Sequence, residues 1–84
     1  MKIETVVGLV MTEIERAEKL HPVWPRDLIH AGMLCAEECG EMSKAILDHD
    51  ERKGSKAAII TEAVHIAATA IRLLKNIAET TEND

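Results

Sequence analysis

Trp24 is the only Trp, Tyr or Phe residue in this chain of 84 residues. Aliphatic side chains must therefore supply nearly all of the core volume, which suits packed helices better than a β-sandwich or a barrel. A chain of this length also buries only a modest fraction of its surface when it folds alone. The sequence predicts an all-α protein, a short bundle of about three helices in one domain over residues 1–84, completed by oligomerisation.

Apolar residues recur at helical spacing in the first half of the chain. They predict a helix over about residues 3–20, which Pro22 and the proline three positions later stop. A second helix is expected over about residues 29–49. Asp27 stands just before it, and an aspartate there is a suitable N-cap.

A third helix is predicted over about residues 56–78, with Ser55 as its cap. Its apolar face is wider than one neighbouring helix would cover, so a second copy of the chain should cover the remainder. We therefore expect a homodimer or a dimer of dimers. The polar tail, residues 79–84, is expected to fray.

The formal net charge of −5 argues against binding a nucleic acid polymer, which normally requires a basic face. It does not exclude a small nucleotide that arrives with its own metal ion. The N-terminal segment lacks the pattern of a secretory signal because Glu4 interrupts it. No apolar run approaches the roughly 20 residues that cross a bilayer. The expectation is a cytoplasmic protein with no membrane partner.

Glu38 falls on the apolar side of the second predicted helix, where a leucine would be expected. The apolar residues that share this arc are Leu34, Cys35, Cys39, Met42, Ala45 and Ile46. Burying an unpaired carboxylate costs several kcal/mol, so Glu38 must be neutral, hydrogen-bonded, paired with a cation or bound to a metal. Glu37 and Glu41 lie within reach, and three acids this close repel one another. A divalent cation with oxygen ligands is the simplest remedy.

Glu62 and His65 are three positions apart and lie on one side of the third predicted helix. Taken alone, they are typical of an ordinary solvent-facing polar surface. A short connection suggests that the second and third helices form an antiparallel hairpin, in which this pair faces the acids of the second helix. The result would be an oxygen-rich site with one imidazole, suitable for Mg²⁺ or Mn²⁺.

These residues form a recognisable pattern: Glu37-Glu38-Cys39-Gly40-Glu41, a gap of twenty residues, then Glu62-Ala63-Val64-His65. The pattern resembles the signature of the all-α nucleoside triphosphate pyrophosphohydrolases, the superfamily of MazG, the dimeric dUTPases and phosphoribosyl-ATP pyrophosphohydrolase. The resemblance covers about residues 20–78. It implies a MazG-like fold and release of a nucleoside monophosphate and pyrophosphate from a nucleoside triphosphate.

The same resemblance implies roles for individual residues. The metal ligands would be Glu37, Glu38, Glu41, Glu62 and His65, with Mg²⁺ or Mn²⁺ as the cofactor. Glu38 or Glu41 would activate the attacking water. His65 departs from the pattern because it stands where the family has an aspartate, and imidazole is a weaker partner for Mg²⁺ than carboxylate.

Two other functions remain open on the sequence. A dimer would supply two Glu62-x-x-His65 motifs, the inventory of a ferritin-like di-metal carboxylate protein. A catalytically silent helical assembly module of the same fold is the second alternative.

Four residues are candidates for substrate contacts: Trp24, Arg72, Lys75 and Asn76. Trp24 would stack on a nucleobase, or else fill space between helices. The other three would contact phosphate, or else form a solvated helix surface.

Overall fold

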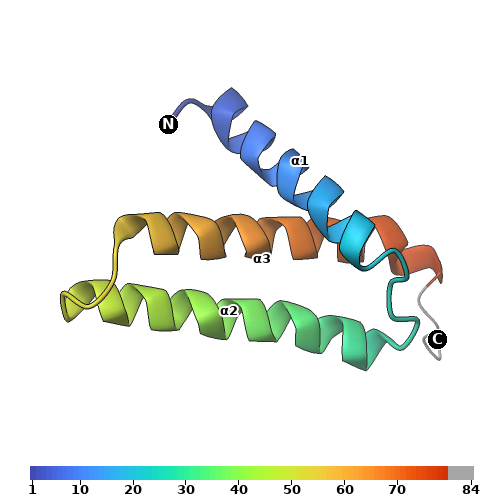
Figure 1. Cartoon of the computed structure of the whole chain (residues 1–84). Coiled ribbons are helices and arrows are strands. Elements are labelled where there is room, and N and C mark those ends of the chain that lie inside the picture. Colours follow the sequence, from blue (N-terminus) through green and yellow to red (C-terminus); the bar gives the residue numbers. More distant parts are fainter. Residues whose placement is uncertain (80–84) are drawn as a thin grey trace.

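The computed structural model describes residues 1–79, and these residues form three helices and no strand. The helices are α1 (Ile3–Leu20), α2 (Leu28–Asp50) and α3 (Lys56–Asn76), and a single 3₁₀ turn, η1 (Ile77–Glu79), follows. Helices α2 and α3 run antiparallel as a hairpin, and α1 crosses α3 obliquely (Figure 1). The prediction of an all-α chain with three helices is confirmed. Residues 80–84 of the tail that was expected to fray lie outside the described residues.

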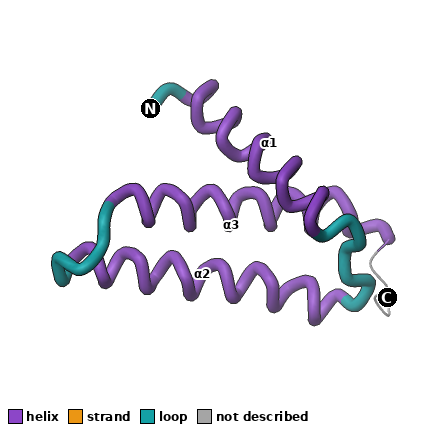
Figure 2. Tube along the Cα trace, in the orientation of Figure 1, coloured by secondary structure: helices purple, strands orange, loops and turns teal. Residues whose placement is uncertain are grey.

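Both predicted N-caps are present. One carboxylate oxygen of Asp27 accepts a hydrogen bond from the backbone N–H of Ile29 at 3.2 Å, and the Ser55 hydroxyl accepts one from Ala58 at 3.3 Å. Each bond satisfies a backbone donor that the first turn of a helix leaves free. The loops at these caps are short, and Figure 2 shows how little of the described chain lies outside helices.

Small side chains decide how closely the helices approach. Ala68 on α3 is buried against Val10 and Ile14 of α1, and Ala31 and Ala45 are the buried residues of α2. Helix α2 packs along α3, whereas α1 touches α3 without approaching α2 in the described chain. The hydrophobic core is therefore a narrow strip along α3, and α1 packs on the rest of the described chain only where it crosses α3.

Much of the apolar surface stays outside this strip. The large apolar side chains that remain exposed are Met1, Ile3, Val7, Leu9, Met11, Leu20, Val23, Ile29, Met33, Ile46, Leu47, Ile60, Ile71, Leu74 and Ile77. The predicted apolar arc of α2 is accordingly covered only in part: Ala45 is buried, whereas Cys39 and Ile46 are exposed. The expectation that this arc is a buried face was wrong for those two residues, because α3 covers only a narrow strip of α2.

Helix α3 is long and apolar enough to cross a membrane, with a mean hydropathy of 1.6 over its most apolar window. We expected no apolar run close to the roughly 20 residues that cross a bilayer. By its length and its mean hydropathy α3 comes close to that limit, so this expectation was wrong. The helix also carries Glu62, His65 and Arg72, and it packs against both other helices.

Candidate metal centre

Two pairs of ligand-type side chains meet where α2 faces α3. Glu38 and Glu41 are three positions apart on α2, and Glu62 and His65 are three positions apart on α3. Each pair lies on one side of its helix, and the antiparallel hairpin brings the pairs together. One ligand atom from each of the four residues lies within 4.8 Å of the others. Glu37, the fifth residue named from the sequence, is exposed and does not join this group.

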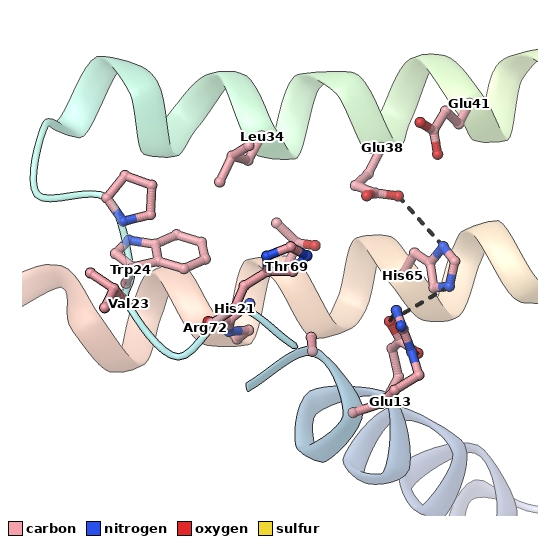
Figure 3. A pocket seen from close by; sticks show the side chains of 13 residues that line it. Glu13, His21, Val23, Trp24, Leu34, Glu38, Glu41, His65, Thr69 and Arg72 are labelled. Carbon is pink, nitrogen blue, oxygen red and sulfur yellow. Dashed lines mark hydrogen bonds and ion pairs between the residues drawn. The ribbon is translucent and has the colours of Figure 1, made fainter. Parts of the chain in front are cut away.

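His65 is the centre of the group. Its Nδ1 lies 3.7 Å from Oε2 of Glu38 and 3.6 Å from Oε2 of Glu62. Its Nε2 lies 3.6 Å from Oε2 of Glu13, which α1 supplies (Figure 3). The imidazole therefore stands between carboxylates of three different helices.

Glu13 is the site residue that the sequence reasoning missed. Its two oxygens accept hydrogen bonds from Arg16 at 2.7 and 2.6 Å, and its side chain is only 14% exposed. One signal was available in the sequence: Glu13 directly precedes Ile14 and comes three positions after Val10, at the edge of the apolar stripe. A carboxylate there points beside the interface between α1 and α3.

The two carboxylates on either side of His65 have opposite electrostatic environments. Burial raises the pKa of Glu38 above its ordinary value; Glu41, Glu62 and Glu13 raise it further, and His65 opposes them. The hydrogen bonds from Arg16 hold the pKa of Glu13 below its ordinary value, despite some burial. Glu13 is thus a stable anion, whereas the charge on Glu38 is unfavourable without a cation nearby.

Two oxygen atoms in the group have no hydrogen-bond partner among the described residues. Oε2 of Glu38 and Oε2 of Glu62 are buried, and neither accepts a hydrogen bond from that part of the chain. Buried acceptors normally have a partner, so these atoms call for a ligand. The donor set of three carboxylates and one imidazole suits a small divalent cation, such as Mg²⁺ or Mn²⁺.

A cleft of about 460 Å³ runs from the metal-ligand group toward the loop between α1 and α2. Glu13, Glu38, Glu41 and His65 line one end, and Trp24 and Arg72 lie toward the other (Figure 3). Its volume falls within the roughly 300–1,000 Å³ typical of small-molecule sites. The cleft therefore joins a cation-binding end to an aromatic end.

Arg72 organises the aromatic end. It is 8% exposed, its guanidinium donates to the carbonyl oxygen of His21 at 2.6 Å, and its Cζ lies 5.2 Å from the centre of the Trp24 ring. The alternative of a solvated helix surface was therefore wrong for Arg72. The Nε of Arg72 and the indole Nε1 of Trp24 are buried without a hydrogen-bond acceptor among the described residues, and the Nε of Arg72 lies 3.9 Å from Oε2 of Glu18. The indole N–H of Trp24 is therefore the donor that a ligand with an oxygen acceptor would satisfy.

Lys75 and Asn76 do not line the cleft. The ammonium group of Lys75 contacts Glu18 of α1 at 2.8 Å, and the Asn76 side chain donates to the carbonyl oxygen of Arg72 at 2.8 Å. The structure thus brings Trp24 and Arg72 together at the cleft. Lys75 instead links α3 to α1, and Asn76 bonds to the backbone within the last turns of α3.

No family model, no curated protein and no solved structure matches this chain. The case for a function therefore depends on the geometry of the site and on the residue pattern itself.

Proposed function

We propose that the protein is a metal-dependent nucleoside triphosphate pyrophosphohydrolase with a MazG-like fold. The observation that carries the proposal is the convergence of Glu38, Glu41, Glu62 and His65, four of the five positions in the pyrophosphohydrolase-like pattern, on one small volume. These four residues would hold Mg²⁺ or Mn²⁺. Two of their oxygen atoms, on Glu38 and Glu62, are buried and without a hydrogen-bond partner in the described chain, which is consistent with that role.

Bound divalent ions would neutralise the phosphate oxygens that an acidic site otherwise repels. The chain's own carboxylates orient a water molecule for attack on the triphosphate and accept its proton. The bond between the α and β phosphates breaks, and nucleoside monophosphate and pyrophosphate leave. Either Glu38 or Glu41 would serve as that base, because both carboxylates line the cleft.

The aromatic end of the cleft would hold the nucleoside. Trp24 offers a flat apolar surface, and Arg72 fixes that surface through its contact with the ring. The indole N–H of Trp24, which has no hydrogen-bond partner in the described chain, would meet an oxygen acceptor of a base or sugar. A single cleft thus provides for both parts of a nucleotide, the phosphates at the acidic end and the nucleoside at the aromatic end.

We infer that the chain works as a homodimer or a dimer of dimers. Many large apolar side chains are exposed, whereas the clustered core of α1 and α3 holds only Val10, Ile14 and Ala68 as buried residues of the described chain. A second copy would cover part of this surface and complete the bundle. Sedimentation equilibrium should show no monomer at micromolar concentration; a stable folded monomer would contradict the inference.

A cytoplasmic location belongs to the same proposal. Helix α3 has the hydropathy of a membrane span, but Glu62 and Arg72 lie in its interior, and charged side chains are costly at the centre of a bilayer. Arg72 pairs here with Glu18 of α1 and with the carbonyl oxygen of His21, and Glu62 lies beside His65 of the same helix. A nucleotide substrate is also found in the cytoplasm.

A panel of nucleoside triphosphates tests the activity. Pyrophosphate release should require Mg²⁺ or Mn²⁺ and should disappear in Glu38→Gln, whereas Glu15→Gln, which changes an exposed glutamate of α1, should behave like the parent. Because the Glu62–His65 pair with two further carboxylates is also a ligand set for iron, the same protein should be exposed to aerobic iron(II). Stable coloured iron loading without pyrophosphate release would favour the ferritin-like alternative.

A further inference from the structure

Arg16, Glu13 and His65 form a continuous chain of contacts that ends at the metal-ligand group. Arg16 donates hydrogen bonds to both carboxylate oxygens of Glu13, at 2.7 and 2.6 Å. Oε2 of Glu13 lies 3.6 Å from Nε2 of His65, and the opposite ring nitrogen, Nδ1, lies 3.6 Å from Glu62 and 3.7 Å from Glu38. Neither Glu13 nor Arg16 belongs to the pattern on α2 and α3 that suggested the site.

We propose that Glu13 is a positioning residue that makes His65 a nitrogen ligand of the bound metal ion. The inference rests on the metal site proposed above, but not on hydrolysis. A neutral imidazole carries one proton, and its two nitrogens have different roles, one donor and one acceptor. In the metal complex, a cation on the Nδ1 side, beside Glu38 and Glu62, would leave the ring proton on Nε2, where the Glu13 carboxylate faces it. The lone pair is then at Nδ1, on the side of Glu38 and Glu62.

Arg16 fixes the carboxylate that faces Nε2. Its two hydrogen bonds hold the Glu13 carboxylate in one orientation, so that Oε2 stays directed at the ring. Glu38 and Glu62 have no comparable support, because their Oε2 atoms lack hydrogen-bond partners among the described residues. A ligating histidine that donates its other N–H to a carboxylate is the usual arrangement in metalloproteins, and such a carboxylate typically contributes roughly 10- to 100-fold to metal affinity.

The arrangement has a consequence for metal preference. Imidazole nitrogen suits Mn²⁺, Co²⁺ and Zn²⁺ better than it suits Mg²⁺, which prefers oxygen ligands. The presence of Glu13 therefore indicates that His65 is a metal ligand held in place by a second carboxylate. It is not merely a weak replacement for the aspartate of the pyrophosphohydrolase-like pattern. Because Glu13 comes from α1, the metal centre includes all three helices.

The test uses Mn²⁺ alone, without nucleotide. Electron spin echo modulation of the Mn²⁺ complex detects a coordinated imidazole through its ¹⁴N coupling, and His65→Gln assigns that coupling. The variants are Glu13→Ala, which removes the carboxylate, Glu13→Gln, which keeps an acceptor oxygen, and the exposed control Glu15→Ala. Circular dichroism checks that each variant is helical.

In the parent we expect ¹⁴N coupling in the Mn²⁺ complex. Glu13→Ala should weaken the coupling and lower Mn²⁺ affinity by roughly 10- to 100-fold, with a smaller change for Mg²⁺. Glu13→Gln should retain part of each signal, and Glu15→Ala should retain all of them.

Three results would overturn the inference. They are a parent that binds no Mn²⁺, a parent complex without ¹⁴N coupling from His65, and a Glu13→Ala variant whose coupling and Mn²⁺ affinity both equal those of the parent. Failure of the proposed function is a separate outcome. A protein that shows the coupling and its loss in Glu13→Ala, yet hydrolyses no nucleotide, supports the positioning role and refutes the activity. A protein that hydrolyses nucleotides without the coupling supports the activity and refutes the positioning role.

Discussion

Glu38→Gln should change two measured quantities in opposite directions. The substitution keeps the shape of the side chain and removes its charge. The free energy of unfolding of the metal-free protein should rise, because acids that repel one another lose one member. The affinity for Mn²⁺ should fall, because the ion loses an anionic ligand. Only a site whose carboxylates are held together for a cation gives both effects.

The size of the stability gain follows from the distances in the site. The ligand atoms of the group lie no more than 4.8 Å apart, and at an effective dielectric constant of about 20 two unit charges at that limit repel by roughly 3 kcal/mol. His65 offsets part of the repulsion on Glu38, and 26% of the Glu38 side chain is exposed, so screening reduces the gain to about 1 kcal/mol. The loss of metal affinity should exceed the roughly 10- to 100-fold expected for a residue that only supports a ligand.

The stability gain should depend on pH. Burial, and then the neighbouring Glu41, raise the pKa of Glu38 in the folded protein. A glutamate with a raised pKa favours the folded state only while it is protonated. That contribution is complete below the ordinary glutamate pKa and is lost as the pH rises through the folded value. Parent and Glu38→Gln should therefore be equally stable in acid, and the variant should be the more stable one at neutral pH.

Urea unfolding in EDTA, followed by circular dichroism at acid and neutral pH, measures the stability difference. Titration of Mn²⁺ followed by electron paramagnetic resonance measures the affinity. Glu37→Gln is the matched control, because it changes the adjacent, exposed glutamate that lies outside the metal-ligand group; both quantities should stay near those of the parent. A Glu38→Gln protein with parental stability and parental Mn²⁺ affinity would show that Glu38 is structural, and the argument for a metal centre would fail.

Two further predictions concern the ligand set and the cleft. His65→Asp should tighten Mg²⁺ binding and reduce any preference for Mn²⁺, because it replaces a nitrogen ligand with an anionic oxygen; calorimetric titration of both proteins with each ion tests this, and unchanged affinities would place His65 outside the metal shell. A nucleotide added with Mg²⁺ should change the emission of Trp24, the only tryptophan, whereas Mg²⁺ alone should not; an unchanged spectrum at saturating nucleotide would place the base elsewhere.

The helices were predictable because each is specified locally. Apolar spacing predicted the observed bounds of α1, and Asp27 and Ser55 marked the starts of α2 and α3. The largest error was at the end of α3, where a 3₁₀ turn replaces the last helical residues that were expected. Helix ends commonly tighten in this way because their last carbonyl groups have no partners.

The half of the site on α2 and α3 was also predictable. Two pairs spaced by three residues, joined by a short hairpin connection, can meet in few ways. Glu13 was not predictable to the same degree, because its position depends on where α1 crosses α3. That crossing is set by the close approach of Val10 and Ile14 to Ala68, which comes from a distant part of the chain. Helical spacing within α1 contains no information on such a contact.

Arg72 was misjudged for a different reason. Arginine is rarely buried, so a position on a mostly polar strip of α3 suggested solvent or phosphate. Its partner is instead the carbonyl oxygen of His21, 51 positions earlier, in the loop that α1 and α2 share. A backbone acceptor leaves no trace in the side-chain pattern, so only the structure shows this contact.

His65 departs from the pyrophosphohydrolase-like pattern, and the geometry gives this departure a physical reason. An imidazole has nitrogen atoms on opposite sides, and here one faces Glu13 of α1 while the other faces Glu38 of α2 and Glu62 of α3. The side chain of aspartate is shorter, and its single carboxylate cannot face the ligands of α2 and α3 and also contact Glu13 of α1. His65→Asp should therefore separate two properties: oxygen-preferring ions should bind more tightly, while α1, which packs on α3 and not on α2 in the described chain, should lose one of its links to the site. Faster amide hydrogen exchange in α1, together with tighter Mg²⁺ binding, would show that this histidine connects the first helix to the metal centre as well as supplying a ligand.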